Sequence, residues 1–272
     1  MPTVPVEGTR LYYEERGSGA PLLLIHGPGG HLGMFAGVAE RLASSYRVIT
    51  YDRRGFGRSE APSPPRKDHL RRHADDAAAL LREIGAPRAT VVGWSMGGVV
   101  ACALAVHHGD AASRIVLYEA PLHAKEHMGV RLASAIGGAL ALDKLGMHRR
   151  GAKRFLRFAL GYNNGGNAFD ELEPKMRESI LANAASIMAE LEAGTGEELS
   201  LGDLEKIRCP VGIVVGTRSA RFLIAAADRC AAIFPSARIV RMQSGDHVMN
   251  VRQPAVLVRA IEDALPRSAA ST

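Results

Sequence analysis

One serine stands in a setting that favours nucleophilic chemistry. Ser95 lies at the centre of Gly93-Trp-Ser95-Met-Gly97, which follows a predicted strand at Ala89–Trp94 and precedes a predicted helix at Gly98–His107. Small residues at positions 93 and 97 allow the backbone to turn sharply, so that the serine hydroxyl stands clear of the sheet. A chance Gly-x-Ser-x-Gly sequence has no reason to fall between a strand and a helix, and the placement therefore predicts a nucleophile.

Short apolar strands that alternate with longer helical patterns must position this serine. Runs rich in Val and Ile are typical of a mostly parallel sheet built from βα units, and a hairpin around Gly8 is expected at its edge. The eight predicted strands are Thr3–Glu7, Arg10–Glu15, Pro21–His26, Arg47–Asp52, Ala89–Trp94, Arg114–Glu119, Val211–Gly216 and Arg238–Met242. The fold class predicted from this pattern is α/β.

The alternation stops between about residues 122 and 208, where no strand is predicted. Three helical patterns occupy this stretch, at Glu126–Leu142, Arg149–Leu160 and Glu171–Leu191. The last of them has Pro174 in its first turn. We expect residues 1–121 and 209–272 to form the α/β core and residues 122–208 to form a helical cap inserted between two strands, as lids over active sites do.

Three further segments, together with the serine motif, resemble the α/β-hydrolase superfamily in their order along the chain. Leu23-Leu-Ile-His26-Gly27 resembles the strand and His-Gly turn of the oxyanion loop, and Tyr51-Asp-Arg-Arg-Gly-Phe-Gly-Arg-Ser59 resembles the loop after the next strand. Gly245-Asp-His247 resembles the histidine loop near the C-terminus. The resemblance covers nearly the whole chain outside the helical insertion. It implies an α/β-hydrolase fold with an eight-stranded sheet, and a serine hydrolase that needs no cofactor or metal.

The resemblance also implies the roles of two residues. Ser95 would attack an acyl carbon, while His247 would accept the serine proton and later return it to the leaving group. The histidine follows the last predicted strand and precedes a final amphipathic helix at Pro254–Leu265.

The acid that should orient His247 departs from the family pattern. After the strand Val211–Gly216 the chain continues Thr-Arg-Ser219, where most of the superfamily has an aspartate, and a serine cannot balance an imidazolium. We predict that Glu119 supplies the carboxylate, because it ends the strand after the nucleophile helix and catalytic groups gather at that edge of a parallel sheet. Some haloalkane dehalogenases and the zearalenone-type lactone hydrolases place their acid similarly. Asp246 and Asp228 remain the alternatives.

The oxyanion loop is the second departure. One backbone donor is expected at Met96, and the other usually follows the His-Gly pair, where this chain has Pro28. Proline has no N–H group, so Gly29 or Gly27 must supply the donor, the loop must be rearranged, or the hole is incomplete. A missing donor costs about 2.7–4 kcal/mol of transition-state stabilisation.

The expected partner is a small molecule. The insertion is rich in Leu, Ala and Met, which favours an ester, lactone or thioester of a medium-sized, mainly apolar compound. His31, just beyond the oxyanion loop, and Trp94, beside the nucleophile, are candidate substrate-binding residues, although Trp94 also suits packing in the turn. Because the position of Glu119 resembles that of the acid in the zearalenone-type lactone hydrolases, we modestly favour a lactone as the substrate.

Composition argues against several other classes of protein. The net charge of +6 includes a basic stretch between residues 53 and 72, but this stretch lacks the stacking aromatics of a nucleic-acid binder. No long apolar run suggests a membrane span, no secretory signal is visible, and three cysteines without paired spacing predict no disulfide framework. The His-Ala-Lys-Glu-His sequence at 123–127 and the pair His69 and His73 have no evident further metal ligand. We expect a soluble, cytoplasmic monomer or homodimer.

Two other functions remain open. The same scaffold supports cofactor-free C–C bond cleavage or dioxygenase-type chemistry, in which the serine is secondary. It also supports non-catalytic binding of a small molecule, for which the absent aspartate and Pro28 are the motivation.

Overall fold

An eight-stranded sheet organises the chain. The computed structural model describes residues 2–60, 69–123, 129–194 and 199–265. The sheet has the strand order β1-β2-β4-β3-β5-β6-β7-β8. Its strands are β1 (Thr3–Val6), β2 (Thr9–Arg16), β3 (Ala20–Ile25), β4 (Tyr46–Tyr51), β5 (Ala89–Trp94), β6 (Ala112–Tyr118), β7 (Val211–Gly216) and β8 (Arg238–Met242). All eight predicted strands are confirmed.

The sheet is antiparallel only at one edge. Strands β1 and β2 form a hairpin, and Gly8 in its turn has φ of +70°, a conformation that glycine adopts without strain. Strand β2 pairs antiparallel with β4, and β4, β3, β5, β6, β7 and β8 then pair in parallel. The carboxyl ends of β5, β6 and β7 consequently meet at one edge, which is where ligands bind in sheets of this kind.

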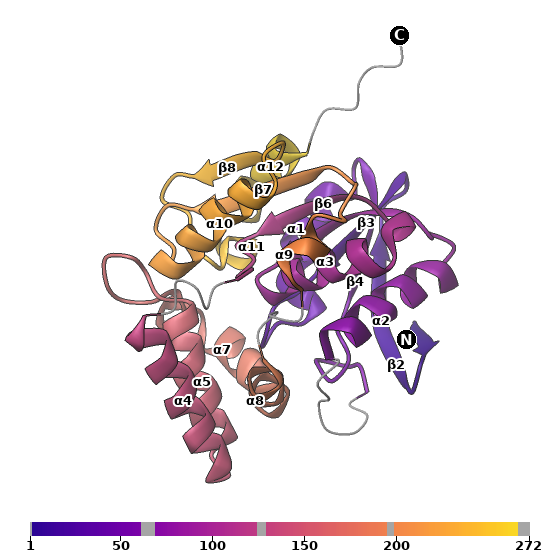
Figure 1. Cartoon of the computed structure of the whole chain (residues 1–272). Coiled ribbons are helices and arrows are strands. Elements are labelled where there is room, and N and C mark those ends of the chain that lie inside the picture. Colours follow the sequence, from indigo (N-terminus) through magenta and orange to yellow (C-terminus); the bar gives the residue numbers. More distant parts are fainter. Residues whose placement is uncertain (1, 61–68, 124–128, 195–198, 266–272) are drawn as a thin grey trace.

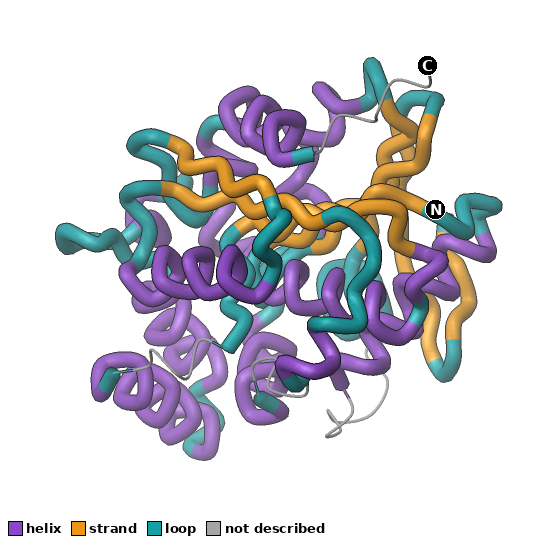
Figure 2. The backbone as a smooth tube through the Cα atoms, turned by 45° about the horizontal axis from the view of Figure 1, so that its top comes forward, coloured by secondary structure: helices purple, strands orange, loops and turns teal. Residues whose placement is uncertain are grey.

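Helices cover both faces of the sheet (Figure 2). Helices α2, α3 and α10 pack on one face and α1, α11 and α12 on the other. The helices of the core are α1 (Ala36–Leu42), α2 (His69–Glu83), α3 (Met96–His107), α10 (Arg221–Ile233), α11 (Met249–Arg252) and α12 (Pro254–Ala264), with 3-10 turns at Leu32–Phe35 and Gly109–Ala111. Alternate residues of each parallel strand face opposite helical layers, which explains their unbroken apolar sequences. In the described part of the chain, no helix is long and apolar enough to cross a membrane.

The helical cap lies between β6 and β7 in the chain, and Figure 1 shows α4, α5, α7 and α8 grouped below the sheet. The helices between β6 and β7 are α4 (Val130–Lys144), α5 (His148–Ala159), α6 (Ala168–Glu171), α7 (Pro174–Leu181), α8 (Ala184–Ala193) and α9 (Leu201–Leu204), of which α9 packs on α3 of the core. The prediction of a single helix over Glu171–Leu191 is wrong, because the helix is interrupted between α7 and α8. Asn183 at this break uses its side-chain oxygen to accept the Gly57 N–H at 3.0 Å, a local bond of the kind that draws Asn out of helix interiors.

A buried ion pair joins the cap to the core. Arg53, which follows β4, is fully buried and donates two hydrogen bonds to Glu190 of α8, at 2.6 and 3.0 Å. The guanidinium also lies 4.7 Å from the centre of the Phe56 ring. Nearby, the hydroxyl of Ser186 donates to the carbonyl of Gly55. The loop after β4 therefore anchors α8 of the cap to the core.

The energetics of this ion pair give a first prediction. Replacing Glu190→Gln leaves the buried Arg53 charge without its partner, and the free energy of unfolding should fall by about 3–5 kcal/mol. Urea titration measures the change. The control is Glu178→Gln in α7, whose partner Arg149 is exposed, and which should cost less than about 1 kcal/mol. Equal losses in the two variants would contradict the assignment.

Candidate active site

Ser95 sits in a strained turn between β5 and α3. Its φ of +55° lies in a region that residues with a side chain rarely adopt. Close packing leaves no room for larger residues at either side: a Cβ at Gly93 would lie 2.2 Å from the carbonyl oxygen of Gly97, and a Cβ at Gly97 would lie 2.1 Å from that of Ile25. The Ser95 N–H donates to the carbonyl of Tyr118 at 2.9 Å. The two glycines thus permit the sharp turn that presents the hydroxyl.

The turn after β3 packs directly against this serine. A Cβ at Gly27 would lie 2.8 Å from the Cβ of Ser95, so glycine is required for the approach. The Gly30 N–H closes the turn by donating to the Gly27 carbonyl at 3.1 Å, and Gly29 within it has φ of +72°. Met96 begins α3, and the first N–H groups of a helix have no acceptor within it. Gly27 thus packs on Ser95, Gly29 lines the same cavity as Ser95, and Met96 follows the serine at the start of α3.

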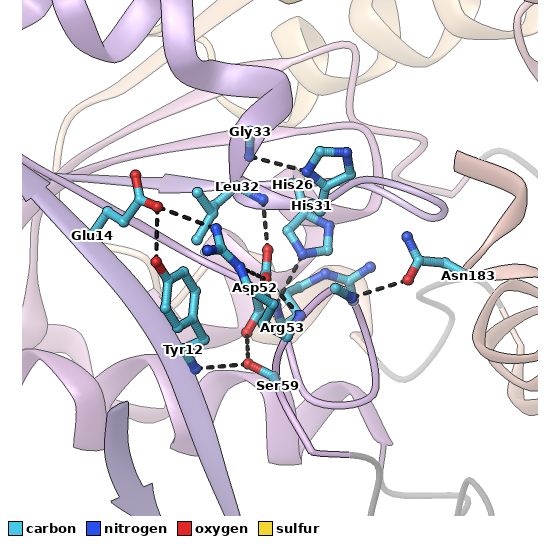
Figure 3. Close-up of polar contacts among 12 residues, drawn as sticks. Tyr12, Glu14, His26, His31, Leu32, Gly33, Asp52, Arg53, Ser59 and Asn183 are labelled. Carbon is cyan, nitrogen blue, oxygen red and sulfur yellow. Dashed lines mark hydrogen bonds and ion pairs between the residues drawn. The ribbon is translucent and has the colours of Figure 1, made fainter. Parts of the chain in front are cut away.

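The loops after β3 and β4 are fixed to one another by polar contacts (Figure 3). Oδ1 of Asp52 accepts the N–H of Leu32 at 2.7 Å, and the Asp52 carbonyl accepts the Ser59 hydroxyl at 2.6 Å. The Arg53 N–H donates to Nε2 of His26 at 2.9 Å, while Nδ1 of His26 contacts the Gly27 carbonyl at 2.8 Å. Burial holds the pKa of His26 well below 6.5, so its ring is neutral with the proton on Nδ1.

Glu119 projects from the end of β6 into the protein. It is 1% exposed, with φ of +50°, and its carboxylate binds three groups. Oε1 accepts the Gly216 N–H at 2.6 Å and the Ser219 hydroxyl at 2.5 Å, and Oε2 lies 2.5 Å from Nδ1 of His247. A buried carboxylate with this set of donors can orient the imidazole and balance its charge.

Side chains from β5 and β6 hold the loop that carries His247. The Nε1–H of Trp94 donates to the backbone carbonyl of His247 at 2.7 Å. The hydroxyl of Tyr118 donates to the carbonyl of Asp246 at 2.7 Å and accepts the N–H of Met249 at 3.1 Å. The histidine is thereby positioned by the two strands that end in Ser95 and Glu119.

The two alternative acids lie elsewhere. Oδ2 of Asp246 accepts a hydrogen bond from Arg252 at 2.9 Å, and its Oδ1 accepts the Val248 N–H. Asp228 lies in α10 and forms an exposed ion pair with Arg241 at 2.5 Å. Neither carboxylate contacts His247.

Ser95 and His247 line the same small cavity. Its volume is about 30 Å³, and its walls come from the oxyanion turn, β5, α5 and α7. The lining residues are Pro28, Gly29, Met34, Trp94, Ser95, Phe155, Leu156, Ala159, Leu160, Ile180, His247 and Val248. Ligand pockets usually measure about 300–1,000 Å³, whereas one water needs about 10–15 Å³. The cavity beside Ser95 therefore has room for a few water molecules and is smaller than a site for a medium-sized ligand.

The two residues expected to bind substrate differ in their positions. Trp94 lines the cavity as well as holding the histidine loop. His31 is not among the lining residues. Its Nδ1 accepts the Gly33 N–H at 3.1 Å, and its Nε2 lies 3.3 Å from the hydroxyl of Ser179 in α7.

The candidate metal ligands within the described part of the chain do not assemble into a cluster. The rings of His69 and His73 lie 5.9 Å apart in α2, and among the described residues no group of three His, Cys, Asp or Glu side chains could hold a metal ion. In the sequence at 123–127, only His123 belongs to the described part of the chain.

Sequence reasoning missed the contributions of Ser219 and Tyr118. Ser219 stands where the family usually has its acid and is fully buried, but its hydroxyl serves the carboxylate of Glu119 instead. A buried serine after a strand carries no pattern that identifies its partner. From the sequence, Tyr118 was predicted only as part of the strand that ends at Glu119, and its contact with the histidine loop was not predicted.

A family model described as the alpha/beta hydrolase fold matches residues 20–253, and the chain belongs to this family. The pimeloyl-(acyl-carrier protein) methyl ester esterase of Chromobacterium violaceum is 31% identical over 95% of this chain and 99% of its own length. An uncharacterized hydrolase of Bacillus subtilis, YraK, is 38% identical over 117 residues, which are 43% of each chain. A solved structure of a putative aryl esterase from Burkholderia cenocepacia superposes with a TM-score of 0.75 and 26% identity, covering 96% of both chains.

The neutral buried histidines predict how stability depends on pH. Burial lowers the pKa of His26 and His73 well below 6.5 in the folded state, so the unfolded state binds more protons as the pH falls below 6.5. The free energy of unfolding should therefore decrease by about 1.4 kcal/mol per pH unit for each histidine. Urea titrations between pH 7 and 5 measure this slope, and His73→Leu should reduce it by about 1.4 kcal/mol per pH unit below pH 6.5. An unchanged slope in that variant would contradict the prediction.

Proposed function

We propose that the protein hydrolyses carboxylic esters, lactones or thioesters through a triad of Ser95, His247 and Glu119. The observation that carries the proposal is the contact of Glu119 Oε2 with Nδ1 of His247, in a cavity that the histidine shares with the strained Ser95. Similarity to two proteins named as esterases, at 31% and 26% identity, supports ester hydrolysis.

The first half of the reaction forms an acyl-enzyme. Nε2 of His247 accepts the proton of Ser95 as the hydroxyl oxygen attacks the carbonyl carbon, and Glu119 stabilises the resulting imidazolium through Nδ1. The N–H groups of Met96 and of Gly29 or Gly27 stabilise the oxyanion. His247 then returns the proton to the departing alcohol or thiol. In the second half, water activated by His247 cleaves the acyl-serine and releases the acid.

The cavity favours an apolar acyl group. Phe155, Leu156 and Ala159 from α5 and Ile180 from α7 lie over the serine. Because these are cap residues, residues 122–208 act as the lid of the core formed by 1–121 and 209–272. The ring of His31 contacts Ser179 of α7. His31 would contact a substrate only if α7 moved away from it. We further propose that the enzyme acts in the cytoplasm, as a monomer or homodimer, on a small molecule and not on nucleic acid.

Covalent labelling tests the triad. A fluorophosphonate should add one phosphonyl group to the wild-type protein, as seen by intact mass, and none to Ser95→Ala. Glu119→Gln should slow both labelling and p-nitrophenyl butyrate hydrolysis by about a thousandfold or more, because the imidazolium loses its balancing charge.

The control for labelling is Asp228→Asn, which removes an exposed carboxylate and should label at the wild-type rate. If Glu119→Gln is labelled as fast as the wild-type protein, Glu119 has no part in the mechanism. Retained turnover by Ser95→Ala would favour the C–C cleavage or dioxygenase-type chemistry, and absent labelling and turnover of the wild type would favour a binding protein.

Ser219 is expected to act through Glu119. Removing a hydrogen bond to a charged group costs about 1.5–3 kcal/mol, so Ser219→Ala should lower kcat by about 10–100-fold with little change in KM. The same change in a Glu119→Gln background should have little further effect. Ser113→Ala, in the first half of β6, is the matched control. If Ser219→Ala lowers kcat by the same factor in the wild-type and Glu119→Gln proteins, Ser219 acts independently of the carboxylate.

A further inference from the structure

A second and much larger cavity lies on the outer side of α5. It is a groove of about 980 Å³ lined by residues of α4 and α5 of the cap, the turn at residues 161–166 and the first turn of α10. Figure 1 shows α10 above α4 and α5. A smaller hollow of about 480 Å³ shares Arg154, Arg157 and Phe158 with it. The groove is within the usual size range of a site for an organic ligand.

The lining of this groove is strongly basic. Arg131 of α4, Arg154 and Arg157 of α5 and Arg221 of α10 all contribute to it, and none of its described lining residues is acidic. Arg157 forms an ion pair with Asp170 at 2.6 Å. Within the described part of the chain, the side chains of Arg131 and Arg221 form no ion pair or hydrogen bond. Like charges from three separate elements repel one another, so an anion in the groove would relieve this repulsion.

Aromatic side chains accompany the arginines. The rings of Phe158 and Phe222 are stacked, with their centres 5.6 Å apart, and Tyr162 lies at the same groove. These side chains offer apolar surface to the organic part of a ligand. One carboxylate satisfies one guanidinium in a bidentate pair, whereas phosphate groups present more oxygens and accept several. The combination favours a phosphate-bearing organic molecule.

Helix α5 lies between the groove and the catalytic cavity and contributes residues to both. Arg154, Arg157 and Phe158 face the groove, whereas Phe155, Leu156 and Ala159 line the cavity that contains Ser95. A helix with its side chains is about 10–12 Å across, which sets the separation of the two sites. The floor of the groove also includes Ala220, the residue after Ser219.

We propose that this groove binds the phosphate groups of the substrate, about 10 Å or more from the bond that is cleaved. The proposal rests on the hydrolase function above and names its substrate class: an acyl thioester or ester whose leaving group carries phosphate. Ser95 takes the acyl group as the carbon–sulfur or carbon–oxygen bond breaks, and His247 gives the proton to the departing thiol or alcohol. Water then releases the acid.

Two thioesters with the same reacting bond test the proposal. Butyryl-coenzyme A and S-butyryl-pantetheine share the acyl group and the pantetheine arm, but only the first carries phosphates. At low salt the wild-type KM for the coenzyme A ester should be at least tenfold lower, and added salt should remove most of this difference. Free coenzyme A should inhibit p-nitrophenyl butyrate hydrolysis competitively.

Arginine variants locate the effect. Arg154→Gln with Arg221→Gln should raise the KM for butyryl-coenzyme A at least tenfold, without a change in kcat or in either constant for the pantetheine ester. The control pair Arg149→Gln and Arg259→Gln removes two exposed arginines outside the groove and should change KM less than twofold.

Three outcomes would overturn the inference: equal wild-type KM values for the two thioesters, equal losses from the groove and control variants, or a change in kcat caused by free coenzyme A without competition, which would make the groove an effector site. If Ser95 is labelled and the pantetheine ester is hydrolysed, these outcomes reject the groove alone. Failure of labelling and of all ester hydrolysis rejects the proposed function itself.

Discussion

The carboxylate of Glu119 is the point on which the site depends. A buried negative charge is costly unless several donors surround it, and here the Gly216 N–H, the Ser219 hydroxyl and the His247 ring provide them. These donors come from β7 and from the loops that follow β7 and β8. The charge therefore requires that strands far apart in sequence end in register, and it ties the histidine loop to the centre of the sheet.

The cap depends on a second buried charge pair of the same kind. Arg53 and Glu190 form it on the loop after β4, and the backbone of Arg53 also holds His26 beside the oxyanion turn. Arg53 consequently contacts both α8 and the loop whose turn packs on Ser95. Arg53 therefore ties α8 to the core, whereas α5 and α7 contribute the cap residues that line the cavity.

The sequence predicted the strands because each parallel strand is buried on both faces and forms a short apolar run. It predicted α3 from the setting of Ser95 and α12 from its amphipathic pattern. The position of Glu119 followed from strand order. The partners of Glu119 did not, since Ser219 and Gly216 carry no local pattern for a contact across about a hundred residues. The break between α7 and α8 was missed for a related reason: Asn183 leaves the helix because of a bond to Gly57, which is distant in the chain. Nor does periodicity reveal that arginines of α4, α5 and α10 meet in one groove.

Trp94 and Tyr118 hold the histidine loop, and both belong to the unit β5–α3–β6 that also carries Ser95 and Glu119. Ser95, Glu119 and the two side chains that hold the histidine loop are thus encoded in about thirty consecutive residues that precede the cap. A change in the insertion between β6 and β7 leaves the reaction intact only if Gly216, Ser219 and His247, which follow the insertion, return to their places beside this unit. Two rings of the unit, Trp94 and Tyr118, guide the histidine loop there. A designer who exchanges the cap to alter substrate choice would preserve the reaction by preserving that unit and the return of these residues to it.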